Sequence, residues 1–219
     1  MVILYCANYQ RRGRPRKSAH IVGIGSFMSK NNHLPMLPQA GEIVWSASVN
    51  GKSFSKSVIS NAILLDVLRD RVGTLGVKRG CDMGTCGCCA VLVDGEPRLS
   101  CLTLAQEVND SEITTVEGLA DGHHLAPIQE TFTLYGGSQC GFCTPGFLVV
   151  IEAFLRQNNC PTDEEIKTAI DGNLCRCTGF QPIVDSVRAA AEILRSGENT
   201  LDATDPHSDP HPGFRGHES

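Results

Sequence analysis

The cysteine residues constrain this chain more than any other feature of its sequence. Four of them follow the spacing Cys81-x4-Cys86-x2-Cys89, and eleven residues separate Cys89 from Cys101. This is the plant-type [2Fe-2S] spacing, in which one loop curls so that three thiolates reach two irons. We expect the fourth thiolate to come from a neighbouring strand. The sequence therefore predicts an iron-sulfur cluster held by these four residues.

The same loop leaves two alternatives open. Cys88 competes with Cys89 as the third ligand, although choosing it would break the x2 spacing. Four thiolates also suit a tetrahedral zinc ion, but a zinc ribbon more often shows two C-x2-C pairs than one glycine-rich loop. Gly80, Gly84 and Gly87 allow the loop to curl and let backbone N–H groups approach sulfur, which favours the iron-sulfur interpretation.

A second set of cysteines forms two short pairs, Cys140-x2-Cys143 and Cys175-x-Cys177, with 31 residues between them. The bacterial [4Fe-4S] spacing is absent. Each pair leads into a predicted helix with a proline near its first turn, through "CTPGF" and "CTGFQP". Helix N-termini favour anionic groups, so we expect the two pairs to share an anionic cluster. A lone C-x2-C could be a thioredoxin-like dithiol, but two matched pairs are not typical of one.

Composition places the chain among folded proteins. Of its 219 residues 41% are hydrophobic, and its eleven cysteines are clustered, unlike those of small disulfide-stapled domains. The first 30 residues hold six Lys and Arg and no acidic residue, so the remainder carries 13 basic against 24 acidic residues. An acidic folded body is not expected to bind nucleic acid.

The two ends of the chain are expected to be flexible. Residues 1–41 form a basic arm whose "RRGRPRK" resembles an AT-hook or a twin-arginine export signal. The apolar run that follows is short and lacks a cleavage site, and no stretch approaches the roughly 20 apolar residues of a membrane span. We therefore expect a cytoplasmic protein without a membrane span. Residues 199–219, rich in Pro and His, are predicted to be a disordered tail.

Between these ends the sequence predicts an α+β protein of two domains. Residues 42–118 begin with a hairpin turning at Asn50-Gly51, followed by a helix capped by Ser60 or Asn61 and by three short strands. Residues 119–198 have helical periodicity and predict an all-α domain of four helices with approximate twofold symmetry. One of these helices starts with a capping box of Thr162 and Glu165.

Three motifs, in this order and spacing, carry a family resemblance: "GCDMGTCGCCAVLVDG", "QCGFCTPG" and "GNLCRCTG". Over about residues 42–196 the chain resembles the small iron-sulfur subunit of the molybdenum hydroxylases, the family of xanthine oxidase, aldehyde oxidoreductase and CO dehydrogenase. The resemblance implies a β-grasp ferredoxin domain followed by a helical [2Fe-2S]-binding domain. It departs from the usual pattern at Cys88, commonly Ala, and at Ala90, commonly Thr.

The resemblance also implies a role. Electrons would pass from the molybdopterin cofactor of a large partner subunit through the helical-domain cluster and the ferredoxin-like cluster to FAD on a medium subunit, in a heterotrimer that pairs as (αβγ)2. Gln139 would hydrogen-bond the pterin, and Cys140 would be the ligand nearest to it. The metal ligands of the two [2Fe-2S] clusters would be Cys81, Cys86, Cys89, Cys101, Cys140, Cys143, Cys175 and Cys177.

The chain shows no motif for substrate chemistry of its own. It lacks a G-x-G-x-x-G after a strand, a P-loop and a nucleophile elbow. We therefore expect an electron-transfer subunit of an oxidoreductase with no substrate site. The alternatives are a free-standing double-cluster ferredoxin and a zinc-stabilised interaction module.

Overall fold

The fold is given by a computed structural model, and the description covers residues 41–197. Residues 1–40 of the predicted arm and the whole predicted tail lie outside the described residues. None of the helices within 41–197 combines the length and the apolar character that a membrane span requires.

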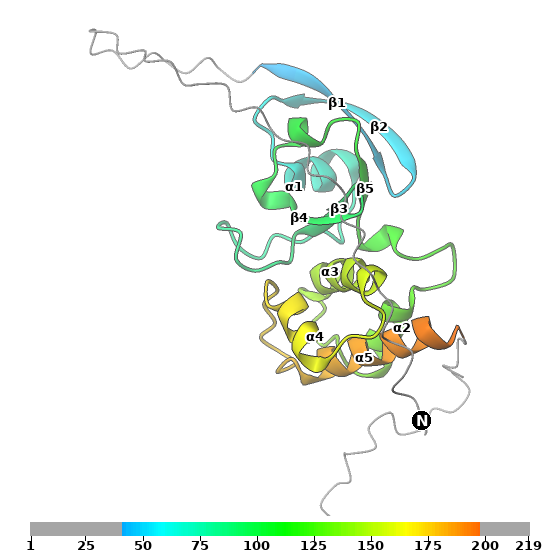
Figure 1. Cartoon of the computed structure of the whole chain (residues 1–219). Coiled ribbons are helices and arrows are strands. Elements are labelled where there is room, and N and C mark those ends of the chain that lie inside the picture. Colours follow the sequence, from blue (N-terminus) through cyan, green and yellow to red (C-terminus); the bar gives the residue numbers. More distant parts are fainter. Residues whose placement is uncertain (1–40, 198–219) are drawn as a thin grey trace, which may run out of the picture. The chain divides into compact units, whose positions relative to one another are not determined.

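The described chain starts with the predicted hairpin. β1 (Glu42–Val49) pairs antiparallel with β2 (Lys52–Ile59) along their full length. Asn50 and Gly51, at φ 50° and 73°, supply the two left-handed residues of a tight two-residue turn. The hairpin prediction is confirmed. Figure 1 shows these two strands as the blue and cyan pair.

Five strands form one mixed sheet in the order β2-β1-β5-β3-β4. β5 (Glu112–Thr114) runs parallel to β1, whereas β3 (Ala90–Val93) is antiparallel both to β5 and to β4 (Glu96–Leu99). All four residues of β3 are buried, which explains its uninterrupted apolar run. Part of this burial of β3 comes from Val149 and Ala153 of a later helix, which pack against Ala90 and Leu92.

The first helix of the chain packs on the sheet, but its start differs from the prediction. α1 (Leu64–Asp66) continues into a π-helical turn, η1 (Val67–Val72), which ends at Gly73. Its N-cap is Ile63, without a side-chain cap, so the prediction of Ser60 or Asn61 was wrong. Backbone pairing replaces the side-chain cap: the N–H of Leu64 donates to the carbonyl oxygen of Thr103 at 2.8 Å.

The predicted strand around Cys101 is shorter than expected. β4 ends at Leu99, and Cys101 lies in a 3-10 turn, η2 (Ser100–Leu102). The N–H and the hydroxyl of Ser100 both donate to the carbonyl oxygen of Cys89, at 3.2 and 2.7 Å. These bonds connect the residue that follows β4 to the end of the cysteine loop. Two further 3-10 turns follow, η3 (Ala105–Val108) and η4 (Val116–Gly118).

Residues 127–196 hold four helices, drawn in green to orange in Figure 1. They are α2 (Pro127–Leu134), α3 (Thr144–Gln157), α4 (Asp163–Ile170) and α5 (Gln181–Ser196). Their apolar faces meet in one core, whose largest fully buried members are Phe132, Phe147, Ile128, Ile151, Ile166 and Ile183. Together with the mixed sheet, these helices confirm the α+β fold class.

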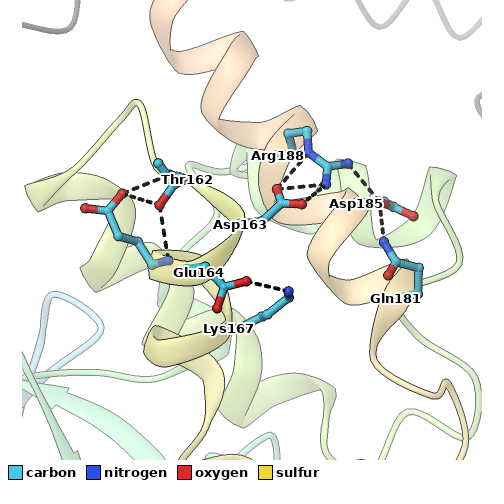
Figure 2. Close-up of polar contacts among 8 residues, drawn as sticks. Thr162, Asp163, Glu164, Lys167, Gln181, Asp185 and Arg188 are labelled. Carbon is cyan, nitrogen blue, oxygen red and sulfur yellow. Dashed lines mark hydrogen bonds and ion pairs between the residues drawn. The ribbon is translucent and has the colours of Figure 1, made fainter.

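Polar contacts fix α4 against α5 (Figure 2). The predicted capping box is present: the Glu165 N–H donates to Thr162 Oγ1 at 3.3 Å, and the Thr162 N–H donates to Glu165 Oε2 at 2.8 Å. Arg188 of α5 forms a bidentate ion pair with Asp163, the first residue of α4, and a further ion pair with Asp185. The start of α4 is thus held by its own cap and by α5.

Candidate metal centres

The first cysteine group is built by the loop between η1 and β3 and by the η2 turn. Cys86 and Cys89 are buried, whereas Cys81 and Cys101 are partly exposed. The pKa of Cys81 is lowered to about 6, because the backbone N–H of Met83 donates to its sulfur, as do the Cys86 thiol and the N–H groups of Cys86 and Thr85. Such donors stabilise a thiolate.

The fourth member, Cys101, faces the other three. Its pKa is raised to about 12 by burial, by a hydrogen bond with Cys89, and by the charges of Cys89, Cys81 and Cys86. The structure therefore brings together all four cysteines of the plant-type spacing. Four thiolates at this density repel one another, and bound iron would relieve that repulsion.

The loop glycines test whether a cluster fits here. A Cβ atom built on Gly80 would lie 3.0 Å from the Cys86 sulfur and 3.1 Å from the Cys88 sulfur. Gly84 and Gly87 both have φ of +72°, which side chains rarely adopt. Close backbone, convergent sulfurs and N–H donors aimed at sulfur are the environment that an anionic [2Fe-2S] cluster requires. These residues fit the group.

Cys88 and Cys89 have different surroundings. Cys89 belongs to the sheet core and interacts with Cys101. Cys88 is also buried, but its thiol donates to the backbone carbonyl of Cys86 at 3.7 Å. Its pKa is raised to about 12 by burial and by the charges of Cys86 and, in the helical part, Cys143. Cys89 therefore remains the candidate ligand, and Cys88 lies on the side of the second group.

The second group stands at the starts of α3 and α5. Cys143 is the N-cap of α3, as the helix-terminus prediction requires. Cys177 lies three residues before Phe180, the N-cap of α5. Gly179 and Phe180 both have positive φ and turn the chain from this cysteine into the helix. The two pairs are thus similar in sequence but differ in their distance from the helix.

The four sulfurs of this second group also interact. The pKa of Cys140 is lowered, because the backbone N–H of Phe142 and the Cys177 thiol donate to its sulfur. The pKa of Cys143 is raised to about 12 by burial, by a hydrogen bond with Cys175, and by the charges of Cys175 and Cys140. Cys175 also contacts the Thr178 hydroxyl at 3.1 Å. The donor set again fits an anionic cluster.

Within residues 41–197, no three Cys, His, Asp or Glu side chains gather in a way that would hold one metal ion. A [2Fe-2S] cluster distributes its four thiolates over two irons, so its ligands need not converge on one point.

The remaining predicted site residue, Gln139, is exposed beside exposed Cys140. Asn173, which is only 3% exposed, is not among the site residues that the sequence predicts. Its Nδ2 donates to the carbonyl oxygen of Gly87 in the first cysteine loop at 3.2 Å. Asn173 stands in the motif "GNLCRCTG", two residues before Cys175, but an asparagine of an ordinary turn could stand in the same place.

Comparison with known proteins agrees with both centres. A family model described as a 2Fe-2S iron-sulfur cluster binding domain matches residues 44–133, and one described as a [2Fe-2S] binding domain matches residues 115–188. The nicotinate dehydrogenase small FeS subunit of Eubacterium barkeri is 42% identical over 151 residues, which are 69% of this chain and 96% of that protein.

Two further proteins are similar to this chain, one over nearly the whole of a separate chain and one over a small part of a longer protein. A chain of quinoline 2-oxidoreductase from Pseudomonas putida 86 superposes with a TM-score of 0.68 at 43% identity, covering 72% of this chain and 98% of that one. The aldehyde oxidoreductase of Megalodesulfovibrio gigas is 40% identical over 158 residues, but the match spans only 17% of that longer protein. With two domains that each bind [2Fe-2S], this chain belongs to the family of small iron-sulfur, electron-transfer subunits of the molybdenum hydroxylases.

Proposed function

We propose that the chain relays single electrons from a molybdopterin centre on a large partner subunit to FAD on a medium partner subunit. A [2Fe-2S] cluster supplies one-electron storage, and the protein supplies its position, burial and potential. Electrons would first enter the helical group and then pass to the ferredoxin-like group. The proposed ligands of the helical group are Cys140, Cys143, Cys175 and Cys177. Those of the ferredoxin-like group are Cys81, Cys86, Cys89 and Cys101.

The observation that carries this proposal is the order of burial along the cysteines. Cys140 and Cys177 are exposed, whereas Cys143 and Cys175 of the same group are partly buried. Cys86, in the other group, is buried and accepts a backbone hydrogen bond from Leu174. Such a series has one end open to a partner and its middle shielded from water, as directed electron transfer requires.

The exposed end would receive electrons. Gln139 and Cys140 are both exposed and adjacent, and Phe142 beside them is 45% exposed. We propose that Gln139 hydrogen-bonds the pterin of the large subunit there and that Cys140 is the ligand nearest to the pterin. At the other group, Met83 and Leu102 are 73% and 65% exposed, and we propose that they face the flavin subunit.

The finer architecture follows from the same proposal. We assign residues 42–118 to a β-grasp ferredoxin domain and residues 119–198 to a four-helix [2Fe-2S]-binding domain. The parallel pairing of β1 with β5 in a mixed sheet supports the first assignment. We propose a heterotrimer that pairs as (αβγ)2 and a cytoplasmic location, and the substrate site would lie on the large subunit.

Single cysteine replacements test the ligand assignment. Cys143→Ser should remove or strongly perturb the helical-group cluster, and Cys89→Ser should do the same to the ferredoxin-like cluster. Each variant should lose one of two low-temperature EPR signals and about half of its iron. Cys88→Ala is the matched control for Cys89→Ser and should keep both signals. Unchanged EPR of both centres in Cys143→Ser would overturn the assignment of that residue.

A further inference from the structure

Two hydrogen bonds join the loops that carry the two cysteine groups. The backbone N–H of Leu174 donates to the carbonyl oxygen of Cys86 at 3.0 Å. The side chain of Asn173 donates to the next carbonyl, that of Gly87, at 3.2 Å. Asn173 is buried and Leu174 is followed at once by Cys175. The loop before one candidate ligand is thus bonded to the backbone of another.

These bonds create a continuous route between two sulfurs. From the Cys86 sulfur the route runs through that residue's side chain to its carbonyl group. It then crosses one hydrogen bond to the N–H of Leu174 and continues along the backbone into Cys175. The Asn173 amide acts on this route from the side, because it holds the neighbouring Gly87 carbonyl and so keeps the two loops in register.

Glycines let the two loops approach this closely. A Cβ on Gly146, in the first turn of α3, would overlap the Gly87 carbonyl oxygen and lie 3.0 Å from Cys88 Cα and 3.1 Å from Asn173 Nδ2. A Cβ on Gly87 would lie 2.5 Å from Asn173 Nδ2. Neither Gly87 nor Gly146 therefore has space for an added methyl group.

We propose that Asn173 is a positioning residue that sets the rate of electron transfer between the two clusters, through the Cys86–Leu174 hydrogen bond. The inference rests on the proposed relay. With both clusters bound, one electron would leave the reduced cluster of the helical group and reduce the oxidised cluster of the ferredoxin-like group, without transfer of a proton or change of a bond. In the isolated subunit the reductant is a photoreduced deazaflavin.

The test compares three variants of the cluster-loaded full chain. Asn173→Ala removes the amide that holds Gly87. Gly146→Ala keeps the Asn173 amide but places a methyl group against the Gly87 carbonyl oxygen and 3.1 Å from Asn173 Nδ2. Gly172→Ala is the matched control, because a Cβ at Gly172 has nothing within 4 Å and its φ is not positive. A light pulse reduces the protein, and rapid absorption spectroscopy follows redistribution of the electron.

We expect transfer to slow about tenfold in Asn173→Ala and in Gly146→Ala, the lower range for changed outer partners of metal sites. Iron content and both EPR signals should stay, and Gly172→Ala should match the parent. Hydrogen–deuterium exchange of the peptide containing Leu174 should accelerate in the first two variants, since its amide loses protection.

Two outcomes separate the inference from the function on which it rests. If exchange at Leu174 accelerates in both variants while the transfer rate stays unchanged, Asn173 does not position the route. If the parent protein shows both EPR signals but no transfer between the clusters, the relay itself is wrong. Where one variant fails to retain its clusters, the other still decides the matter.

Discussion

Asn50 and Thr115 are joined by two hydrogen bonds in opposite directions. Asn50 Nδ2 donates to Thr115 Oγ1 at 2.9 Å, and the Thr115 N–H donates to Asn50 Oδ1 at 2.8 Å. Thr115 is fully buried and its hydroxyl also donates to Glu117. The tight turn of the hairpin is therefore bonded to the chain segment that leaves β5 and leads towards the helices.

Asn50→Ala should destabilise the protein by about 3 kcal/mol, since it removes two bonds of roughly 1 kcal/mol each and places alanine at positive φ. Asn50→Gly also loses the two bonds, but glycine adopts the positive φ without strain. Its destabilisation should therefore be about 1 kcal/mol smaller than that of Asn50→Ala. Urea unfolding followed by circular dichroism measures the difference. Equal midpoints for the two variants would mean that the φ of residue 50 contributes nothing.

The capping box of α4 should be detectable in the titration of Glu165. The pKa of Glu165 lies below its ordinary value, because the backbone N–H of Thr162 donates to its carboxylate, as does the Thr162 hydroxyl. A lowered folded-state pKa stabilises the fold above the unfolded-state pKa, and this contribution disappears as the pH falls through the folded-state value. Carbon-13 NMR of the carboxyl group should show the lowered pKa.

The matched variant is Thr162→Ala, in which the pKa of Glu165 should rise towards its ordinary value. Loss of the N-cap hydroxyl should also cost about 1 kcal/mol of stability. A Glu165 pKa that is the same in both proteins would show that the Thr162 hydroxyl does not bind the carboxylate in solution, since the backbone N–H of residue 162 is present in both.

Arg188→Ala should have only a small effect, although the ion pair of Arg188 with Asp163 is bidentate. Both side chains are about half exposed, at 50% and 52%, and pairs of this kind contribute up to about 1 kcal/mol. Unfolding in low and in high salt measures this contribution, which should shrink with added salt. A loss of several kcal/mol would indicate that Arg188 also supports the cysteine loops.

Gly80→Ala should disturb the ferredoxin-like cluster while leaving the helical one intact. The new methyl group would lie 3.0 Å from the Cys86 sulfur and 3.1 Å from the Cys88 sulfur, which is too close for an unstrained contact. One EPR signal should broaden or disappear, and the other should not change. The double variant Gly80→Ala with Cys88→Ala removes one of the two crowding sulfurs and should recover part of the lost signal; no recovery would place the strain elsewhere.

Local patterns were sufficient for the elements in which neighbouring residues decide the outcome. The Asn50-Gly51 turn and the Thr162–Glu165 capping box are formed by residues at most three positions apart. The start of α1 could not be predicted in this way. There the chain pairs with residues 103–105, so Ile63 becomes the N-cap and the nearby Ser60 and Asn61 are not used.

The position of Cys101 shows the same limit. Its spacing from Cys89 marked it as a candidate ligand, and the expected strand was reasonable for "PRLSCLTL". The two bonds from Ser100 to Cys89 join residues eleven positions apart and replace the end of that strand by a 3-10 turn. The thiol still reaches the first group, although the element that carries it is different.

The sequence by itself determined the two sets of four cysteines, the glycines between them, and the α+β succession of hairpin, sheet and helices, because these depend on spacing and on local conformational preference. The tertiary structure alone decided how the loops that carry the two sets are hydrogen-bonded to each other. Asn173 and Leu174 meet Gly87 and Cys86 across more than eighty residues of chain. Contacts of such separation arise only when two cores have packed, and no periodicity in the sequence records them.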